Sequence, residues 1–114
     1  MIERYVGAVT LTELVRIRYT MEALIQSENS LREQLTEPDT WASYPAILHD
    51  HYRHALEILW GWEQLCQRID MLPENFLDKC AYRAKACQSI DRITLLEVYL
   101  RRLLNQCSLA REAP

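Results

Sequence analysis

Glycine and proline are scarce in this chain, with two glycines and four prolines among 114 residues. A fold of many short strands needs a turn about every 8–12 residues, and these two residue types supply most such turns. Their scarcity therefore argues against a β-sandwich or barrel and favours a small number of long helices.

Long apolar runs are also missing. No stretch approaches the roughly 18 apolar residues that a membrane-spanning helix requires. The first residues, MIERYVGAV, lack a basic segment followed by a long apolar one. We therefore expect a cytoplasmic protein. Thiols stay reduced in that compartment, so the four cysteines are expected to form no disulfide.

Catalytic motifs are absent as well. The sequence contains no glycine-rich phosphate loop, no GxSxG, no HExxH and no dinucleotide-binding fingerprint. No arginine stands five residues before any of the three histidines, which excludes a helical Arg-x4-His ribonuclease pattern. These absences predict a protein that is not an enzyme and that carries no cofactor.

The composition is typical of one soluble globular domain. Hydrophobic residues make up 49% of the chain and charged residues 25%, with a net charge of −3. A chain of this length can bury a hydrophobic core without disulfides or a metal. We expect a single helical domain that spans residues 1–114.

Residues that start and stop helices divide the chain. Thr10 and Glu13 have the spacing of a capping box, and Pro38 ends the periodic run that follows them. Ser43 can cap a second helix, and Pro45 suits its first turn. Pro73 separates the second helix from a third, and Ser89 is the only obvious cap before a fourth. The predicted helices cover about 10–36, 44–69, 74–88 and 90–111.

Each predicted helix carries a seam, meaning a row of apolar residues at alternating steps of three and four. This repeat favours near-antiparallel packing at about 20°, and the short loops make neighbouring helices antiparallel. The sequence therefore predicts an all-α antiparallel four-helix bundle. A helical hairpin completed by a second chain has the same seams, so dimerisation stays open. The seam residues are Leu14, Ile17, Met21, Leu24, Leu31 and Leu35; Leu48, Tyr52, Ala55, Leu59, Trp62, Cys66 and Ile69; Leu77, Cys80, Ala84 and Cys87; and Ile93, Leu96, Leu100, Leu103, Cys107 and Ala110.

One charged pair stands on the apolar side of the first helix. Glu28 occupies an expected apolar place, and Arg32 follows it by four residues. This spacing predicts an ion pair at the end of the bundle. A charged pair that sets the register of helix pairing is the alternative.

The cysteines all fall on seam positions, at Cys66, Cys80, Cys87 and Cys107. Buried cysteine commonly acts as a small hydrophobic residue, so we expect these side chains to fill the core. Inward-facing thiols that meet could instead bind zinc or copper(I). No CxxC motif supports that second interpretation.

The stretch LHDHYRHALEILWGWEQL, residues 48–65, contains all three histidines. Asp50, His54 and Glu57 follow steps of four and three, which is also the spacing of metal ligands on a helix. On a helical wheel they point away from the apolar side, so a solvated face is predicted and a metal-binding bundle is the alternative. His51 lies nearer the edge of the core, whereas His49 lies on the opposite flank.

Charge is distributed unevenly along the chain. Residues 1–78 contain 6 basic and 13 acidic residues, net −7, whereas residues 79–114 contain 7 basic and 3 acidic residues, net +4. A basic half can contact a nucleic-acid backbone. The residues predicted for that role are Lys79, Arg83, Arg101 and Arg102. The alternative is that basic helices pack beside acidic ones within one bundle.

Apolar residues outside the seams predict an interaction surface. In the last helix they spread around more than half of the circumference, and the second helix adds a tryptophan. Excess apolar surface on a small protein usually marks an interface, and aromatic residues are favoured anchors there. We expect a non-enzymatic protein that acts through protein–protein contact as an adaptor, inhibitor or subunit, and that associates with itself. The predicted interface residues are Trp60, Leu95, Val98 and Tyr99.

Overall fold

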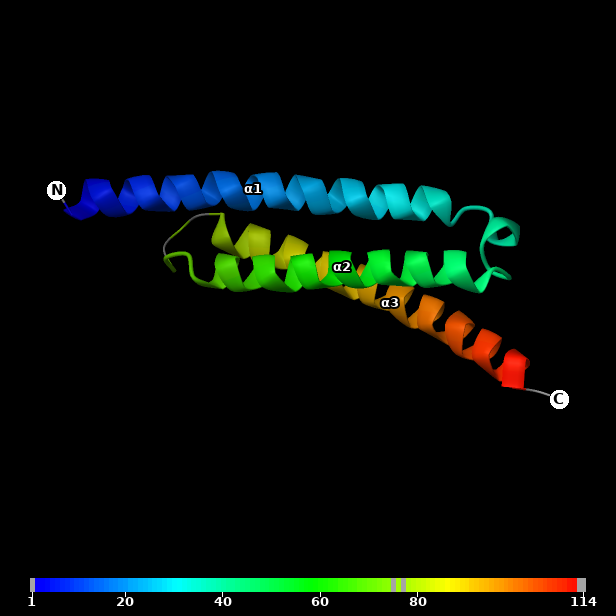
Figure 1. Cartoon of the computed structure of the whole chain (residues 1–114). Helices are drawn as coiled ribbons and strands as arrows, with labels where there is room; N and C mark the ends of the chain where they lie inside the picture. Colours follow the sequence, from blue (N-terminus) through cyan, green and yellow to red (C-terminus); the bar gives the residue numbers. More distant parts are fainter. Residues whose placement is uncertain (1, 75, 77, 113–114) are drawn as a thin grey trace.

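Three α-helices make up the fold seen in the computed structural model (Figure 1), which describes residues 2–74, 76 and 78–112 and the side chains of 11–74, 76 and 78–107. The helices are α1 (Ile2–Gln34), α2 (Pro45–Asp70) and α3 (Lys79–Glu112), and a short 3-10 turn, η1 (Pro38–Thr40), joins the first two. The described residues include no strand. The molecule is a rod with principal extents of 72 × 21 × 18 Å.

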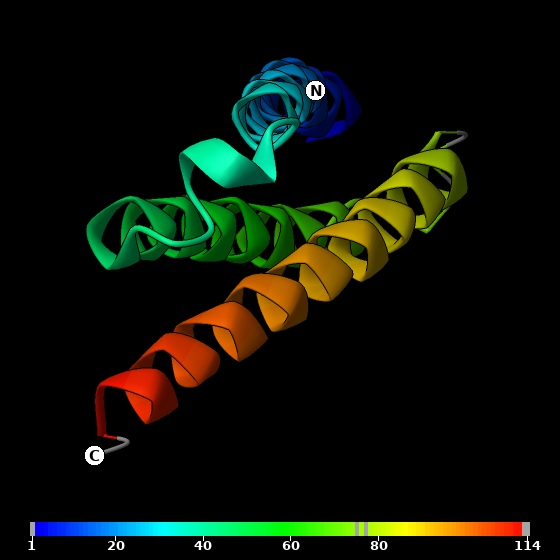
Figure 2. The ribbon, with the colours of Figure 1, turned by 90° about the vertical axis from the view of Figure 1, so that its right-hand side faces the viewer.

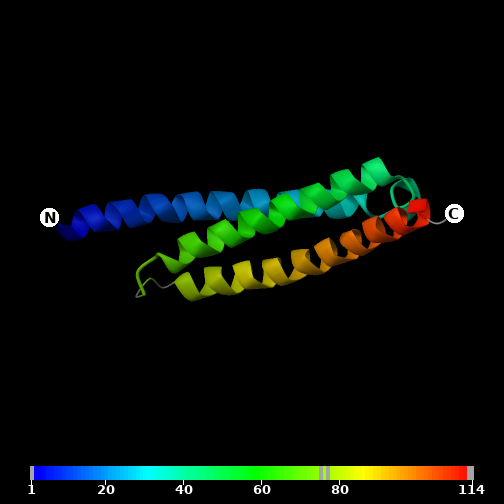
Figure 3. The same cartoon turned by 60° about the horizontal axis from the view of Figure 1, so that its bottom comes forward.

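Helix α2 is the packing partner of both other helices. It runs antiparallel to α1 and to α3, as Figures 1 and 3 show. Figure 2 shows that α1 and α3 lie on different sides of α2 and diverge toward the end of the rod that carries η1. The all-α prediction is confirmed. A four-helix bundle is not, because the described chain forms three helices.

The third and fourth predicted helices are one continuous helix. Ser89, the predicted cap, is 1% exposed in the middle of α3. The buried row runs straight through it, with Ala86, Ser89, Ile93 and Leu100 at steps of three, four and seven. Serine favours caps but does not interrupt a helix that packing stabilises, and α3 contains neither glycine nor proline. The prediction of a break at this serine is wrong for that reason.

The predicted helix starts also differ from the structure, and the helix predicted to begin at residue 74 begins at Lys79. Helix α1 begins at Ile2, so Thr10 lies inside the helix and does not cap it. Helix α2 begins at Pro45 after Tyr44, with no side-chain cap from Ser43. The placement of proline in the first turn is confirmed, since its fixed φ suits that position.

The predicted seams of α1 and α2 form the core. Leu48, Ala55, Trp62 and Ile69 are buried along α2 at intervals of seven residues. On α1 the buried seam residues are Ile17, Met21 and Leu31, and Leu14, Leu24 and Leu35 are half-buried. In α3 the seam from Ile93 to Cys107 is buried or half-buried. Leu77 and Ala110 lie outside the residues whose side chains are described.

Helix α2 has a second buried side, which the seam alone does not predict. Ile58 and Leu65 are 2% and 1% exposed, because α1 packs closely there. Gly61 permits this approach: a Cβ atom at that position would lie 2.6 Å from a methyl group of Leu24. A glycine inside a helix costs about 0.5–1 kcal/mol relative to alanine, and the close packing of α1 offsets that cost.

A tryptophan is buried at the end of the rod that carries η1. Trp41 is 2% exposed, although it stands in a connecting segment. Its ring contacts the rings of His51 and Tyr99 edge-on, with centroid distances of 6.0 and 6.4 Å. This indole fills space between the connection, α2 and α3 where the helices diverge.

The continuity of α3 predicts opposite results for two substitutions at one position. Ser89→Ala should change the free energy of unfolding by less than about 0.5 kcal/mol, because no helix start depends on the hydroxyl group, which accepts only a long hydrogen bond, 3.4 Å, from the guanidinium group of Arg92. Ser89→Pro should cost about 3 kcal/mol or more, since proline breaks the interior of a helix. Urea denaturation measures both values, and a loss of about 1 kcal/mol or more for the alanine variant would instead support a helix boundary at this serine.

Candidate protein-interaction surface

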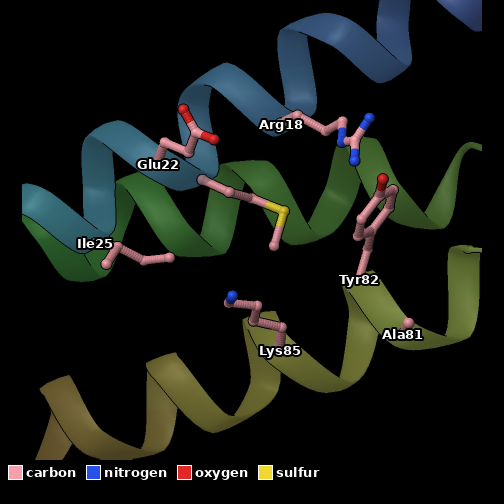
Figure 4. Close-up of a pocket in the computed structure, with 7 residues that line it drawn as sticks. Arg18, Glu22, Ile25, Ala81, Tyr82 and Lys85 are labelled. Carbon is pink, nitrogen blue, oxygen red and sulfur yellow. The ribbon is translucent and has the colours of Figure 1, made fainter.

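The side of the rod opposite α2 contains a groove between α1 and α3. Its volume is about 290 Å³. Figure 4 shows side chains of both helices that line it. The lining residues are Arg18, Met21, Glu22 and Ile25 from α1 and Ala81, Tyr82 and Lys85 from α3. We call the surface around this groove the open side.

Large apolar side chains are exposed on both helices. Leu11, Val15 and Tyr19 follow one another at four-residue steps on α1 and are 62%, 62% and 75% exposed. On α3, Leu95 is 74% exposed and Tyr99 is 48% exposed. Aliphatic and aromatic side chains at such exposure are typical of a surface that another protein covers.

All of these side chains except Tyr19 belong to a second row at steps of four and three on each helix, which mixes apolar and polar residues and which we call the outer seam. On α1 the outer seam is Leu11, Val15, Arg18, Glu22 and Ile25, at steps of four and three. On α3 the outer seam is Ala81, Lys85, Gln88, Arg92, Leu95 and Tyr99, also at alternating steps of four and three. Each includes residues that line the groove, so both outer seams face the open side.

The structure does not unite the four predicted interface residues. Leu95 and Tyr99 share the outer seam of α3, and Val98 beside them is half-buried. Trp60 is 54% exposed on α2. Its neighbours two positions away, Ile58 and Trp62, are buried, and residues two apart lie about 200° apart around a helix. Trp60 therefore points away from the core on the outer face of α2 and does not join the open side.

A buried carboxylate links α1 to α3 near the groove. Glu28 is 4% exposed, and Arg32 donates a hydrogen bond from Nε to its Oε2 atom at 2.9 Å. This confirms the predicted ion pair. Arg92 of α3 adds a second cation, with its Nε atom 3.6 Å from the same oxygen. The sequence gives no signal for this third member, because the two helices come together only in the folded chain.

Lys79 is a structural residue and not a surface cation. It is 3% exposed, and its ammonium group donates hydrogen bonds to the carbonyl oxygens of Asp70 at 3.1 Å and Leu72 at 2.8 Å. It also donates to Oε1 of Glu74 at 2.9 Å. That hydrogen bond and the positive charge lower the pKa of the Glu74 carboxyl group. The turn between α2 and α3 surrounds the charge of Lys79, so its burial does not favour the predicted contact with a nucleic acid, which stays a prediction.

Two of the other predicted basic residues pair within the chain. Arg83 donates from Nε to Oδ1 of Asp70 at 2.7 Å, and this hydrogen bond raises the pKa of the guanidinium group. Arg101 lies 3.6 Å from Oε1 of Glu97. Arg102 is exposed. The pair of Arg83 and Asp70 supports the alternative in which the basic C-terminal half packs beside acidic residues of α2.

The four cysteines do not form one cluster, although Cys66 of α2 and Cys87 of α3 are neighbours, and two of the four lie outside the core. Cys80 and Cys87 are exposed, so their prediction as seam residues is wrong. Continuous α3 instead turns Tyr82, Ala86 and Ser89 inward. Cys66 and Cys107 are half-buried, and burial is the main cause that raises the pKa of the Cys66 thiol, followed by the charge of Asp70. No group of three metal-binding side chains occurs among the described cysteines, histidines and acids.

The histidine-rich face of α2 is solvated, with one histidine at its edge. Asp50 and Glu57 are exposed, and His54 is half-buried. His51 is half-buried against Trp41, which agrees with its predicted position at the edge of the core. Burial lowers the pKa of the His51 imidazole below 6.5, and the charge of His54 lowers it further.

No protein-family model, curated protein or solved structure matches this chain. Within residues 2–74, 76 and 78–112, no helix combines the length and the apolar character needed to cross a membrane.

Replacing Lys79 with methionine tests its structural role. Lys79→Met keeps most of the stem but leaves two backbone carbonyl groups without their donor, so the free energy of unfolding should fall by about 2–4 kcal/mol. Lys85→Met is the matched control on the exposed groove rim and should cost less than about 0.5 kcal/mol. Equal effects of the two substitutions, measured by urea denaturation, would contradict a structural role for Lys79.

The lowered pKa of His51 predicts a loss of stability in mild acid. Because the folded-state pKa lies below the unfolded value of 6.5, the unfolded chain binds more protons as the pH falls through 6.5. The free energy of unfolding should therefore decrease between about pH 7.5 and about pH 5.5. His51→Asn should reduce this decrease, and His49→Asn, an exposed control, should not. If His51→Asn loses as much stability as the unchanged protein in denaturation at both pH values, this cause is wrong.

Proposed function

We propose that this chain is a non-enzymatic protein that acts through protein–protein contact and associates with itself through the open side. The observation that carries the proposal is the second seam on α1 and α3, which leaves Leu11, Val15 and Leu95 at 62%, 62% and 74% exposure. Helices with one seam on their own bundle and another toward solvent are typical of larger helical assemblies.

The energetics of burial support this surface over other parts of the molecule. Complete burial of a leucine or valine side chain contributes about 1.5–3 kcal/mol. Tyr19 and Tyr99 add aromatic rings with a polar end, which interfaces favour. A second chain that covers the open side would bury all these side chains together, whereas a partner on the opposite face would meet Trp60 with mainly polar neighbours.

Two further parts of the proposal concern location and nucleic acids. A cytoplasmic location is supported by four cysteines that form no disulfide with one another. Nucleic-acid contact through the basic half receives less support, because Lys79 is buried and Arg83 and Arg101 each lie beside a carboxylate. We therefore propose protein contact alone.

Native mass measurements on two matched variants test the proposal. The unchanged protein should have a mass that is a multiple of the chain mass, and Leu95→Glu should shift it toward the monomer by roughly tenfold in dissociation constant, because it places a charge in the covered surface. Trp60→Glu makes a comparable change on the opposite face and should leave the association unchanged.

Circular dichroism of both variants shows whether the helices are intact. A monomeric unchanged protein at every concentration would contradict self-association. An associated protein that responds to Trp60→Glu and not to Leu95→Glu would place the interface elsewhere.

A further inference from the structure

We infer that the second copy packs its α1 antiparallel on α1, with Arg18 of each copy opposite Glu22 of the other. This inference rests on the proposed self-association and names its register. It comes from the outer seam of α1, whose two charged members lie between apolar ones.

The outer seam of α1 is self-complementary in one antiparallel register. In an antiparallel pair, residues whose numbers add to a constant lie opposite each other. With a sum of 40, Arg18 meets Glu22, and Val15 meets Ile25. The two-fold axis repeats each pair, so two ion pairs lie between two apolar layers. Leu11 then meets Asn29 at either end.

The spacing of these residues also satisfies the geometry of a coiled coil. Val15, Glu22 and Asn29 recur every seven residues, and so do Leu11, Arg18 and Ile25. Each layer of an antiparallel coiled coil combines one residue from each such set. Every pair in the register of sum 40 meets this condition. Tyr19, at 75% exposure, lies on the flank of the outer seam one residue from the axis, so the two copies of this side chain would be neighbours beside the ion pairs.

The side chains that would pair across the axis are accessible in a single chain. Arg18 and Glu22 are both exposed at the groove, and Figure 4 shows them along its α1 wall. Within the described part of the chain, neither forms an ion pair with another side chain. Opposite charges from a second copy would give each of them a partner.

The ends of the helices support the same register. The N-terminal end of α1 extends past the loop between α2 and α3, so neither of the other described helices lies beside it (Figures 1 and 3). Since α1 runs parallel to α3 with Glu28 beside Arg92, α1 residue numbers lie level with α3 numbers about 64 higher. In the register of sum 40, Leu11 of the second copy therefore lies at the level of Leu95 along the rod, to within about one helical turn.

A register shifted by two heptads explains less of the surface. With a sum of 26, Leu11 would meet Val15, but Arg18 would meet Ala8. The second copy would then end before it reached Leu95 and Tyr99, which would stay exposed. In the register of sum 40 the second copy instead extends along the groove as far as the level of Leu95 and Tyr99.

Charge exchange between the two positions tests the register. Arg18→Glu and Glu22→Arg should each weaken the dimer by about tenfold or more in dissociation constant, because each places like charges opposite one another twice. The double variant Arg18→Glu/Glu22→Arg restores opposite charges and should return within about threefold of the unchanged protein. Arg16→Glu makes the same charge change two residues away, on the other side of α1, and is the control.

Mixing the two single variants provides a second measurement. Each should be mainly monomeric alone, and an equimolar mixture should form a heterodimer, since both positions are then acidic in one chain and basic in the other. Sedimentation gives the masses, and circular dichroism confirms equal helicity. The register is wrong if the unchanged protein dimerises but the charge variants behave like Arg16→Glu. It is also wrong if neither the double variant nor the mixture regains dimerisation. Either result would leave self-association itself intact. A monomeric unchanged protein would overturn both proposals.

Discussion

The shortness of α2 is the constraint on which the rest of the structure depends. Helix α2 has 26 residues, whereas α1 has 33 and α3 has 34, and both longer helices pack against it. Among the side chains that the structure describes, those of α2 alone are buried on two sides, with Ile58 and Leu65 toward α1 and the seam toward the shared core. The described chain has no fourth helix, so each longer helix keeps an outer seam that no described helix of the same chain covers. Because α2 is shorter than α1, the N-terminal end of α1 also extends beyond the α2–α3 loop.

Charged side chains fix the geometry of this open arrangement. Lys79 binds the carbonyl groups at the end of α2 and so sets where α3 begins. Glu28 holds Arg32 of its own helix and faces Arg92 of α3, which links the two helices that diverge. Buried ions are tolerated when they are paired and hydrogen-bonded, and removing one partner is costly. These charges link the three helices within one chain, and Lys79 and Glu28 among them are buried.

Sequence periodicity predicts correctly those helices whose apolar seam packs against one neighbouring helix. The seams of α1 and α2 are correct because apolar spacing alone decides them. The break at Ser89 is wrong because capping preference is weaker than a buried row that continues through the residue, and the misplaced Cys80 and Cys87 follow from that break. Burial of Lys79 depends on carbonyl groups up to nine residues away, which no local pattern shows.

The candidate site is only partly predictable for a similar reason. Excess apolar character correctly identifies Leu95 and Tyr99 as exposed residues, but the side of α2 that carries Trp60 depends on where α1 packs. The outer seam of α1 is visible in the sequence as Leu11, Val15, Arg18, Glu22 and Ile25. A search for purely apolar rows misses it, because Arg18 and Glu22 stand at its centre. It can be interpreted as a second contact surface only after the structure shows that α2 packs on the apolar seam of α1.

Amide hydrogen exchange along α1, measured over a range of protein concentrations, would test most directly whether a second copy covers the outer seam. A helix end without a neighbour opens readily, whereas one packed against a second chain exchanges slowly. We expect amides of the first half of α1 to be protected at high concentration and to lose that protection on dilution, while the α2 core stays protected throughout. Fast exchange in the first half of α1 at every concentration would contradict the proposed pairing.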